Sequence, residues 1–409
     1  MREFFKVKSI AETIALARGF GRVGTETVPL CGATGRVLAA EVAADMDVPG
    51  FDRSTMDGFA TRAKSTYGAS ATNPAMLAVV GSVAMGEKPS MTVGPGEAVR
   101  IATGGMLPRG ADAVVEVEHT EELDEDLIEV TKAVAPLASV VQRGEDVRKG
   151  EVLLRAGSRL RPQDLALAAS VGRAGLCVYK TPVVGILSTG DEVVPVEALP
   201  EPGQVRDMNA HALFGQMVEA WAVPLLLGIV PDDEKALYEA MTDALGRCDV
   251  VLVSGGSSVG TRDHTVSAIE RLDDSQILVH GVAISPGKPT ILARSMGRQV
   301  WGLPGNVVSC MVVARALVGP AVAHLGGLVG EPSPGPSVLA KLARNVPSVM
   351  GRTDYIRVRL STREDGHLAE PLFGKSGVIR TMVEGQGMVV ASENAEGLEA
   401  GTLVRVQLF

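Results

Sequence analysis

The stretch Val183-Val-Gly-Ile-Leu-Ser-Thr-Gly-Asp-Glu192 joins an apolar, β-branched run to an acidic loop that contains a glycine. A short apolar run that ends in a turn is typical of a strand buried on both faces. The pattern recurs at residues 250–253, which lead into Ser254-Gly-Gly-Ser-Ser-Val-Gly260. Because loops at the carboxyl ends of parallel strands converge on one crevice, both stretches predict a parallel sheet with a ligand site at its edge.

The surrounding sequence alternates between strand and helix patterns. Apolar runs predict strands at 183–187, 225–230, 250–253, near 290 and at 299–303. Helical spacing between them predicts helices at 209–221, 232–246, 263–271 and 305–318. Such a βαβ series indicates a doubly wound parallel sheet, and we assign this α/β domain to residues 177–329.

The flanking segments read as further domains. Helical spacing over 9–20 starts at a plausible N-cap, Ser9, and residues 47–140 show short β-like runs between Gly and Pro turns. After the linker Glu331-Pro-Ser-Pro-Gly-Pro336, short strands return. We therefore expect separate domains at 1–46 with 141–176, at 47–140 (small and β-rich) and at 330–409 (a small β barrel or sandwich).

Composition excludes several classes of function. The net charge of −9 offers no general basic field for nucleic acid or an anionic membrane, and only 3% of residues are aromatic. The apolar stretch 307–329 contains Arg315, Pro320 and His324 and reads as a buried helix. The N-terminus has no apolar signal segment. We expect a cytoplasmic protein without nucleic-acid or membrane partners.

The loops suit an anionic ligand and a divalent cation. Backbone amides of glycine-rich turns bind phosphate, and carboxylates bind Mg²⁺. Pro286-Gly-Lys-Pro289 places one lysine on a stiff turn, and Gly302-Leu-Pro-Gly-Asn306 follows another strand. Plain alternatives exist: each loop taken alone suits an ordinary turn, and Asp232 or Asp233 suits a helix N-cap.

Taken in order, the motifs closely resemble the MoeA family, the molybdopterin molybdenumtransferases that include the gephyrin E domain. The series comprises VPGFDRSTMDGFA (48–60), RIATGGMLPRGADAVVEVE (100–118), RGEDVRKG (143–150), STGDE (188–192), PGQVRDMN (202–209), GIVPDD (228–233), SGGSSVGTRDHT (254–265), PGKP (286–289), GLPGNVVS (302–309), GRTDYIRVRL (351–360) and KSGVIRTM (375–382). The resemblance covers nearly the whole chain.

The resemblance implies a multi-domain fold with a function in molybdenum cofactor biosynthesis. The implied subunit is elongated and L-shaped, with the α/β domain carrying the nucleotide–pterin site. The resemblance also implies that the domain at 1–46 with 141–176 is a linker or dimerisation domain and that the domain at 330–409 is a β barrel. The implied activity inserts molybdate into adenylylated molybdopterin with release of AMP, assisted by Mg²⁺. The family forms homodimers in which N-terminal segments of the partner subunit approach the site, and we also expect transient contacts with other proteins of cofactor biosynthesis.

The resemblance also assigns roles to residues. The expected catalytic residues are Asp191, Glu192, Asp233 and Asp263, of which Asp191, Glu192 and Asp263 are the expected Mg²⁺ ligands. Expected contacts to adenylylated molybdopterin are Thr189, Gly190, Ser254, Gly255, Gly256, Ser258, Gly260, Pro304, Gly305 and Asn306. Those to molybdate are Lys288, Pro289, Ser309, Arg352 or Arg357, and Ser376. A second subunit is expected to contribute Asp52, Ser54, Met56, Asp57, Thr103 and Asp146.

One departure from the family pattern concerns charge. The family commonly has a lysine where this chain has Ser285, which removes one cation from the expected oxyanion site. Three other functions remain open at this point: a tungstate-specific insertase, a molybdopterin adenylyltransferase, and a catalytically weak scaffold of the same fold.

Overall fold

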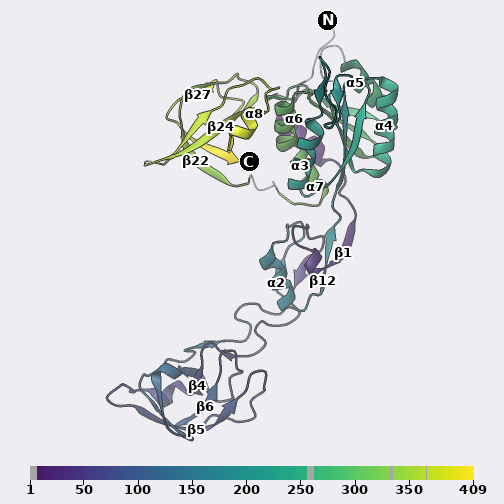
Figure 1. Ribbon diagram of the computed structural model, residues 1–409. Helices are drawn as coiled ribbons and strands as arrows, with labels where there is room; N and C mark the ends of the chain where they lie inside the picture. The colour runs from purple at the N-terminus through teal and green to yellow at the C-terminus, as the bar shows by residue number, and fades with distance from the viewer. Residues whose placement is uncertain (1–6, 256–261, 331–334, 365) are drawn as a thin grey trace. The chain divides into compact units, whose positions relative to one another are not determined.

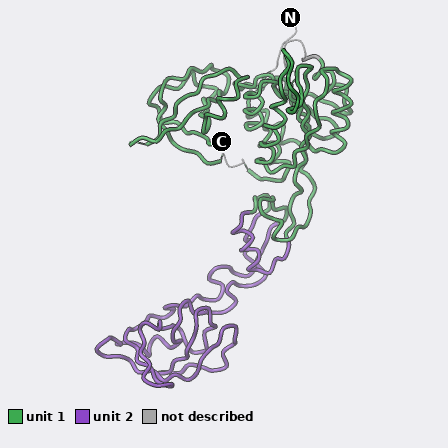
Figure 2. Tube along the Cα trace, viewed as in Figure 1, with its two compact units in different colours: residues 1–40, 156–160, 176–409 green, residues 41–155, 161–175 purple. Residues whose placement is uncertain are grey.

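The computed structural model describes residues 7–255, 262–330, 335–364 and 366–409. The chain divides into two compact units (Figure 2). Unit 1 comprises Met1–Ala40, Ala156–Leu160 and Leu176–Phe409, and unit 2 comprises Glu41–Arg155 and Arg161–Gly175. Most of the predicted linker at 331–336 lies outside the described residues.

Unit 1 contains the predicted α/β sheet. Its strand order is β16-β13-β17-β21-β20-β18. The bounds are Val223–Val230 (β16), Val183–Thr189 (β13), Val250–Ser254 (β17), Arg298–Leu303 (β21), Ile291–Ser295 (β20) and Gln276–His280 (β18). Strands β16, β13, β17 and β21 are mutually parallel, with Ile186 aligned with Leu226 on one side and Leu252 on the other.

The sheet is mixed, whereas the sequence pattern predicted parallel strands throughout. Strand β20 pairs antiparallel with both β21 and β18. Only Met296 and Gly297 separate β20 from β21, and both have positive φ (52° and 73°). A two-residue connection with this backbone makes a hairpin, because a parallel crossover needs about a dozen residues.

Helices cover both faces of the sheet (Figure 1). On one face lie α3 (Asn209–Glu219), α6 (Val307–Val313) and α7 (Gly319–Leu325), joined by α1 (Ile10–Arg18), and their apolar side chains form one core with the strands. On the other face, α4 (Glu234–Arg247) and α5 (Arg262–Glu270) form a second core. The sheet is therefore buried on both faces.

One helical stretch is long and apolar enough to cross a membrane by length and composition. This stretch, Val307–Leu325, contains a π-helical turn, Ala314–Val318, between α6 and α7. Of its most apolar window, 67% is buried inside the structure, and the stretch contributes eleven buried residues to the first core. Burial of this kind is typical of a core helix.

The last part of unit 1 is the predicted β barrel. The sheet order β19-β24-β25-β22-β28-β26 closes through pairing of β24 with β26. Its strands are β22 (Ser337–Leu342), β24 (Thr353–Arg363), β25 (Gly366–Pro371), β26 (Gly387–Ala391) and β28 (Leu403–Leu408), with α8 (Arg380–Glu384) before β26. Strand β19 (Ile284–Ser285) leaves the α/β domain and pairs with Thr353 and Asp354. This pairing joins the two subdomains beside Ser285.

Unit 2 holds the predicted N-terminal β module. Its sheet has the order β7-β4-β6-β5-β9-β8. The bounds are Ala113–Glu116 (β7), Gly58–Thr61 (β4), Glu97–Ile101 (β6), Ala75–Val83 (β5), Leu127–Val130 (β9) and Thr120–Asp124 (β8). Unit 2 also contains α2 (Pro162–Ser170), with proline in its first turn.

Short two-stranded pairs complete the chain. In unit 1, β1 (Thr25–Pro29) pairs with β12 (Gly175–Tyr179), β14 (Val193–Val194) with β15 (Val205–Arg206), and β23 (Val346–Pro347) with β27 (Gly397–Leu398). In unit 2, β2 (Val42–Ala43) pairs with β11 (Val152–Leu154) and β3 (Arg53–Ser54) with β10 (Val140–Val141).

Candidate active site

A cavity of about 1120 Å³ opens at the carboxyl ends of the parallel strands in unit 1. Gly190 follows β13, Asp232 follows β16, Gly255 follows β17 and Pro304 follows β21, and all four line this cavity. Much of the remaining wall comes from residues 282–289 and from the loops of the barrel at 349–352 and 376–377. Loops that are far apart in sequence thus share one concave site.

One end of the cavity is acidic. The backbone N–H of Asp232 donates to Oδ1 of Asp191 (3.2 Å), and Glu192 lines the wall nearby. Oδ1 of Asp232 is buried and has no hydrogen-bond partner within the described residues. Burial raises the pKa of the Asp232 carboxyl, and the charges of Asp191 and Glu192 raise it further, although His264 opposes them. A carboxyl in this setting holds a proton more readily than an exposed one.

The two neighbouring aspartates at 232 and 233 have different contacts. Asp233 is the N-cap of α4, and its Oδ1 accepts a hydrogen bond from the N–H of Ala236 (2.9 Å). Asp232 lines the cavity, whereas Asp233 is not among its lining residues. The capping alternative raised from the sequence therefore describes Asp233. The sequence signal for this role was that Asp233 stands directly before Glu234, the first residue of the helix, which is the N-cap position.

The opposite end of the cavity carries cations and hydroxyls. Lys288, Ser309, Arg352 and Ser376 all line it. The Nε of Arg352 lies 3.0 Å from Oδ1 of the buried Asp354, so this cation is ion-paired on one side. Sheet order separates this end from the carboxylates, because β16 and β13 lie at one side of the sheet and the 286–289 turn leads into β20 at the other.

The barrel loop at this end is held by backbone and side-chain bonds. The N–H of Val308 donates to the carbonyl of Ser376 (3.0 Å), and a guanidinium N–H of Arg357 donates to the carbonyl of Gly374 (3.1 Å). Arg357 is 7% exposed, and burial lowers its pKa. Of the two arginines considered from the sequence, Arg352 lines the cavity and Arg357 supports the loop that carries Ser376.

The middle of the cavity edge is built from buried hydroxyls and a glycine. The hydroxyls of Ser188, Thr189 and Ser254 are buried at the ends of β13 and β17, without hydrogen-bond partners in the described part of the chain. Gly255 has a φ of +116°, and a Cβ there would lie 2.0 Å from the carbonyl oxygen of Thr189. Only glycine fits this close approach, which leaves the strand ends open to a ligand.

The structure thus places the expected substrate residues in three groups. Those that line the cavity are Gly190, Glu192, Gly255, Lys288, Pro289, Pro304, Gly305, Asn306, Ser309, Arg352 and Ser376. Thr189 and Ser254 are buried at strand ends behind the wall. Gly256, Ser258 and Gly260 lie outside the described residues, as does the side chain of Asp263, whose backbone belongs to α5.

The chain matches three segments of one protein family in order. Residues 6–172 match the family described as "MoeA N-terminal region (domain I and II)", residues 185–324 the "Probable molybdopterin binding domain", and residues 339–409 the "MoeA C-terminal region (domain IV)". The chain belongs to the MoeA family.

Full-length relatives and solved structures agree with this assignment. A molybdopterin molybdenumtransferase of Bacillus subtilis is 34% identical, covering 94% of this chain and 90% of the relative. The enzyme of the same name from Haemophilus influenzae is 32% identical over 94% of each chain. A crystal structure titled molybdopterin biosynthesis MoeA protein, from Pyrococcus horikoshii, has a TM-score of 0.80 at 36% identity and covers 98% of this chain and 99% of its own.

In this MoeA-family chain the residues expected from a second subunit belong to unit 2. There, Oδ1 of Asp57 accepts bonds from the backbone N–H (2.7 Å) and hydroxyl (3.0 Å) of Thr103, which lower the pKa of Asp57. Ser54 and Met56 lie in the same turn, joined by bonds between the Ser54 hydroxyl and the Met56 backbone. Asp52 accepts from the N–H of Arg143 (2.7 Å), and Asp146 donates its N–H to Val48. These residues form one polar loop cluster within unit 2.

The site residues expected from the family resemblance do not include every residue of the cavity. Asp232, Val205, Met208, Val349 and Met350 line it as well, and four of these five side chains are apolar. Val349 and Met350 are more than half exposed, and nothing in their local pattern separates them from an ordinary barrel loop. They line the cavity only because β19 pairs with β24.

The acidic end of the cavity offers carboxylates that suit Mg²⁺. Among the described residues no three His, Cys, Asp or Glu side chains are placed as a ready metal cage. Asp191 and Glu192, which lie close to the buried Asp232 carboxyl at this end of the cavity, fit a cation held by one or two carboxylates and completed by substrate phosphates, which is the usual mode for Mg²⁺. The expected set Asp191, Glu192 and Asp263 stays a prediction.

Proposed function

We propose that this protein is a molybdenum insertase, which transfers molybdate into adenylylated molybdopterin and releases AMP. One observation carries the proposal: a single large cavity has a cationic, hydroxyl-bearing end and a carboxylate end, with buried hydroxyls and the Gly255 turn between them. The first end suits a tetrahedral oxyanion, and the second suits proton and phosphate chemistry. The names of the full-length relatives support the same activity.

The residues divide the work in the following way. Lys288 and Arg352 attract the molybdate dianion, and the hydroxyls of Ser309 and Ser376 donate to its oxygens. An oxo group that leaves molybdate must depart as water, which takes up two protons, and the dithiol of molybdopterin would release two protons as its sulfur atoms bind the metal. Asp232 lies at the carboxylate end of the cavity, where it would supply a proton when the adenylyl group is cleaved. Asp191 and Glu192 would hold Mg²⁺, which would neutralise phosphate charge when the adenylyl group is cleaved. The protein thus orients the two substrates and controls charge.

We further propose a cytoplasmic homodimer in which unit 2 of one subunit approaches the cavity of the other. Support comes from the polar loop cluster of unit 2, where Asp57 and Thr103 are locked together although their loops are exposed. A dimer mass in light scattering, with activity restored on mixing an Asp57→Ala subunit with a Lys288→Ala subunit, would support this arrangement. A fully active monomer would exclude it.

The central test is a reconstituted reaction. Purified protein is mixed with adenylylated molybdopterin, Mg²⁺ and molybdate, and AMP and active cofactor are measured against Lys288→Ala. Release of AMP that depends on molybdate supports the insertase. Formation of adenylylated molybdopterin from ATP would instead identify an adenylyltransferase. If the parent protein releases no more AMP than the Lys288→Ala variant, the protein is a scaffold of the same fold and not an insertase. Parallel reactions with tungstate show which oxyanion is preferred.

A further inference from the structure

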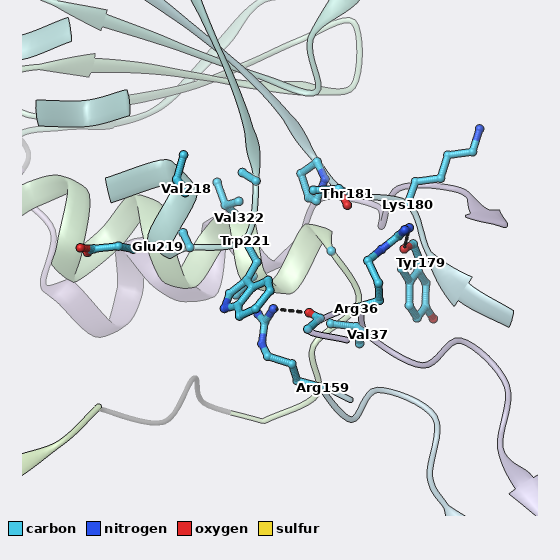
Figure 3. Close-up of a pocket in the computed structure, with 16 residues that line it drawn as sticks. Arg36, Val37, Arg159, Tyr179, Lys180, Thr181, Val218, Glu219, Trp221 and Val322 are labelled. Atoms are coloured by element: carbon cyan, nitrogen blue, oxygen red, sulfur yellow. Dashed lines mark hydrogen bonds between the residues drawn. The ribbon is translucent and has the colours of Figure 1, made fainter. Parts of the chain in front are cut away.

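A second cavity lies at the opposite edge of the same sheet. Its volume is about 540 Å³, and Figure 3 shows its wall. Pro182 and Ala222, which line it, directly precede β13 and β16, so the cavity sits at the amino ends of these strands. The candidate active site lies at their carboxyl ends. The two cavities are therefore separated by the full length of β13 and β16.

The indole of Trp221 is held in place by an unusual backbone. Trp221 has a φ of +61°, a left-handed conformation that is unfavourable for a bulky residue. Its ring lies directly against Gly35, where an added Cβ would be 1.9 Å from Cζ3 of the indole. Nevertheless, Trp221 remains 50% exposed. The chain thus fixes an aromatic ring firmly without burying it.

Arg159 stacks on this ring. Its guanidinium carbon lies 5.2 Å from the ring centroid of Trp221, and one N–H donates to the carbonyl of Gly35 (2.8 Å) (Figure 3). No carboxylate in the described ranges forms an ion pair with Arg159, and burial lowers its pKa. A guanidinium has five N–H donors, so most of its hydrogen-bonding capacity is left for a ligand.

The remaining wall favours an anion with an apolar body. Val37, Pro182, Val218 and Val322 supply apolar surface. The one carboxylate in the wall, Glu219, points away from Arg159, and the amine of Lys180 also points away (Figure 3). Arg36 is already engaged with Glu26 and with the carbonyl of Tyr179. Arg159 is thus the cation that faces an incoming ligand.

We propose that this cavity binds a small planar aromatic carboxylate, with its ring on the indole of Trp221 and its carboxylate on the guanidinium of Arg159. Fixing a half-exposed indole and burying a cation without a carboxylate both cost free energy, and such a ligand would offset both costs. The volume matches small-molecule sites, which are mostly apolar with a few placed polar groups. The site is independent of the proposed insertase reaction.

A segment of another protein is the competing occupant, because half-exposed tryptophans also occur at protein interfaces. The concave wall and the single available cation favour the small molecule. The two occupants are distinguishable by experiment. If Trp221 belongs to a protein interface, replacing it lowers the mass of the assembly, and the cavity shows no preference for a small anion.

Tryptophan fluorescence provides a direct test with the full-length protein. The chain has two tryptophans, and Trp301 is fully buried, so quenching by a small probe reports on Trp221. We expect 4-nitrobenzoate to quench emission with one-site saturation. The neutral isostere 4-nitrobenzamide should bind at least about tenfold more weakly, because it lacks the charge-assisted bond to Arg159.

Matched variants assign the effect to the site. Arg159→Met should weaken 4-nitrobenzoate binding by about tenfold or more and remove the preference over 4-nitrobenzamide. Arg159→Lys should keep part of that preference, because it retains the charge. Lys180→Met, whose amine points away, should change the affinity by less than about twofold. Circular dichroism of each variant verifies folding.

Three results would overturn the proposal. The first is quenching that does not saturate below about 10 mM 4-nitrobenzoate. The second is equal affinity for the carboxylate and the amide in the unmodified protein. The third is a combination of two observations: the Trp221→Ala variant has a lower assembly mass than the parent protein, and the parent protein shows no saturable probe binding. Together they would identify the indole as part of a protein interface.

Discussion

The backbone N–H of Asp232 donates a hydrogen bond to Oδ1 of Asp191, with 3.2 Å between nitrogen and oxygen. This bond ties the loop after β16 to the loop after β13. It keeps the Asp232 carboxyl beside two other acidic groups at one end of the large cavity. The neighbouring Asp233 instead caps α4, so adjacent aspartates have separable roles.

The first prediction separates those roles by substitution. Asp232→Asn should lower the rate of AMP release by about 100-fold, because it removes a positioned proton donor. Asp233→Asn should leave both activity and stability nearly unchanged, since asparagine caps a helix as well as aspartate. Asp233→Ala should reduce the free energy of unfolding by about 1 kcal/mol. Equal activity losses in the two asparagine variants would refute this division.

The second prediction concerns charge at the oxyanion end. Ser285 lines the cavity with Lys288, and Arg352 is partly neutralised by Asp354. Ser285→Lys adds a cation and should tighten molybdate binding by about fivefold, equivalent to about 1 kcal/mol, with the gain shrinking as salt rises. Equilibrium dialysis with molybdate measures this change. Ser285→Met controls for side-chain length, and an equal gain in that variant would exclude an electrostatic cause.

The third prediction compares two glycines with positive φ. Gly228 in β16 has a φ of +94° with no atom within 4 Å of an added Cβ, whereas a Cβ at Gly255 would lie 2.0 Å from the carbonyl of Thr189. Gly228→Ala should therefore cost only backbone strain, about 1–2 kcal/mol. Gly255→Ala should cost a further 1–3 kcal/mol or so, as overpacking does. Urea unfolding of both variants measures the two losses of unfolding free energy. A larger loss in Gly228→Ala than in Gly255→Ala would contradict the prediction.

The fourth prediction is a pH dependence that depends on His324. Burial lowers the pKa of His324, and the charges of Arg22 and Arg18 lower it further, against a hydrogen bond to the Arg18 backbone. As pH falls, His324 is therefore protonated in the unfolded chain before it is protonated in the folded protein, because the unfolded chain has the ordinary histidine pKa of about 6.5. The contribution of neutral His324 to the free energy of unfolding is therefore fully present above about pH 6.5 and is lost as pH falls below that value.

His324→Gln should accordingly show a smaller decrease in unfolding free energy between about pH 7.5 and pH 5.5 than the parent protein. Chemical denaturation at several pH values measures both slopes. Parallel curves for the two proteins would show that His324 does not contribute to the decrease.

Much of the architecture was predictable from the sequence, because local patterns carry it. The apolar run at 183–187 and its repeat at 250–253 are strands buried on both faces, as predicted. The ordered series of motifs along the chain predicted the MoeA family, and the matches to the two MoeA regions and the molybdopterin-binding domain confirm it. The antiparallel β20 was missed, because its direction depends on a two-residue turn with positive φ.

Most strands, the glycine turns and the family could be predicted from the sequence, since each depends on a short stretch of neighbouring residues. Long-range packing settles which of two adjacent aspartates faces the cavity and which of Arg352 and Arg357 lines it. It also brings Trp221 and Arg159 together at the far edge of the sheet. Those outcomes depend on strand register, helix starts and long-range packing. Such contacts join residues many positions apart, so no local pattern contains them.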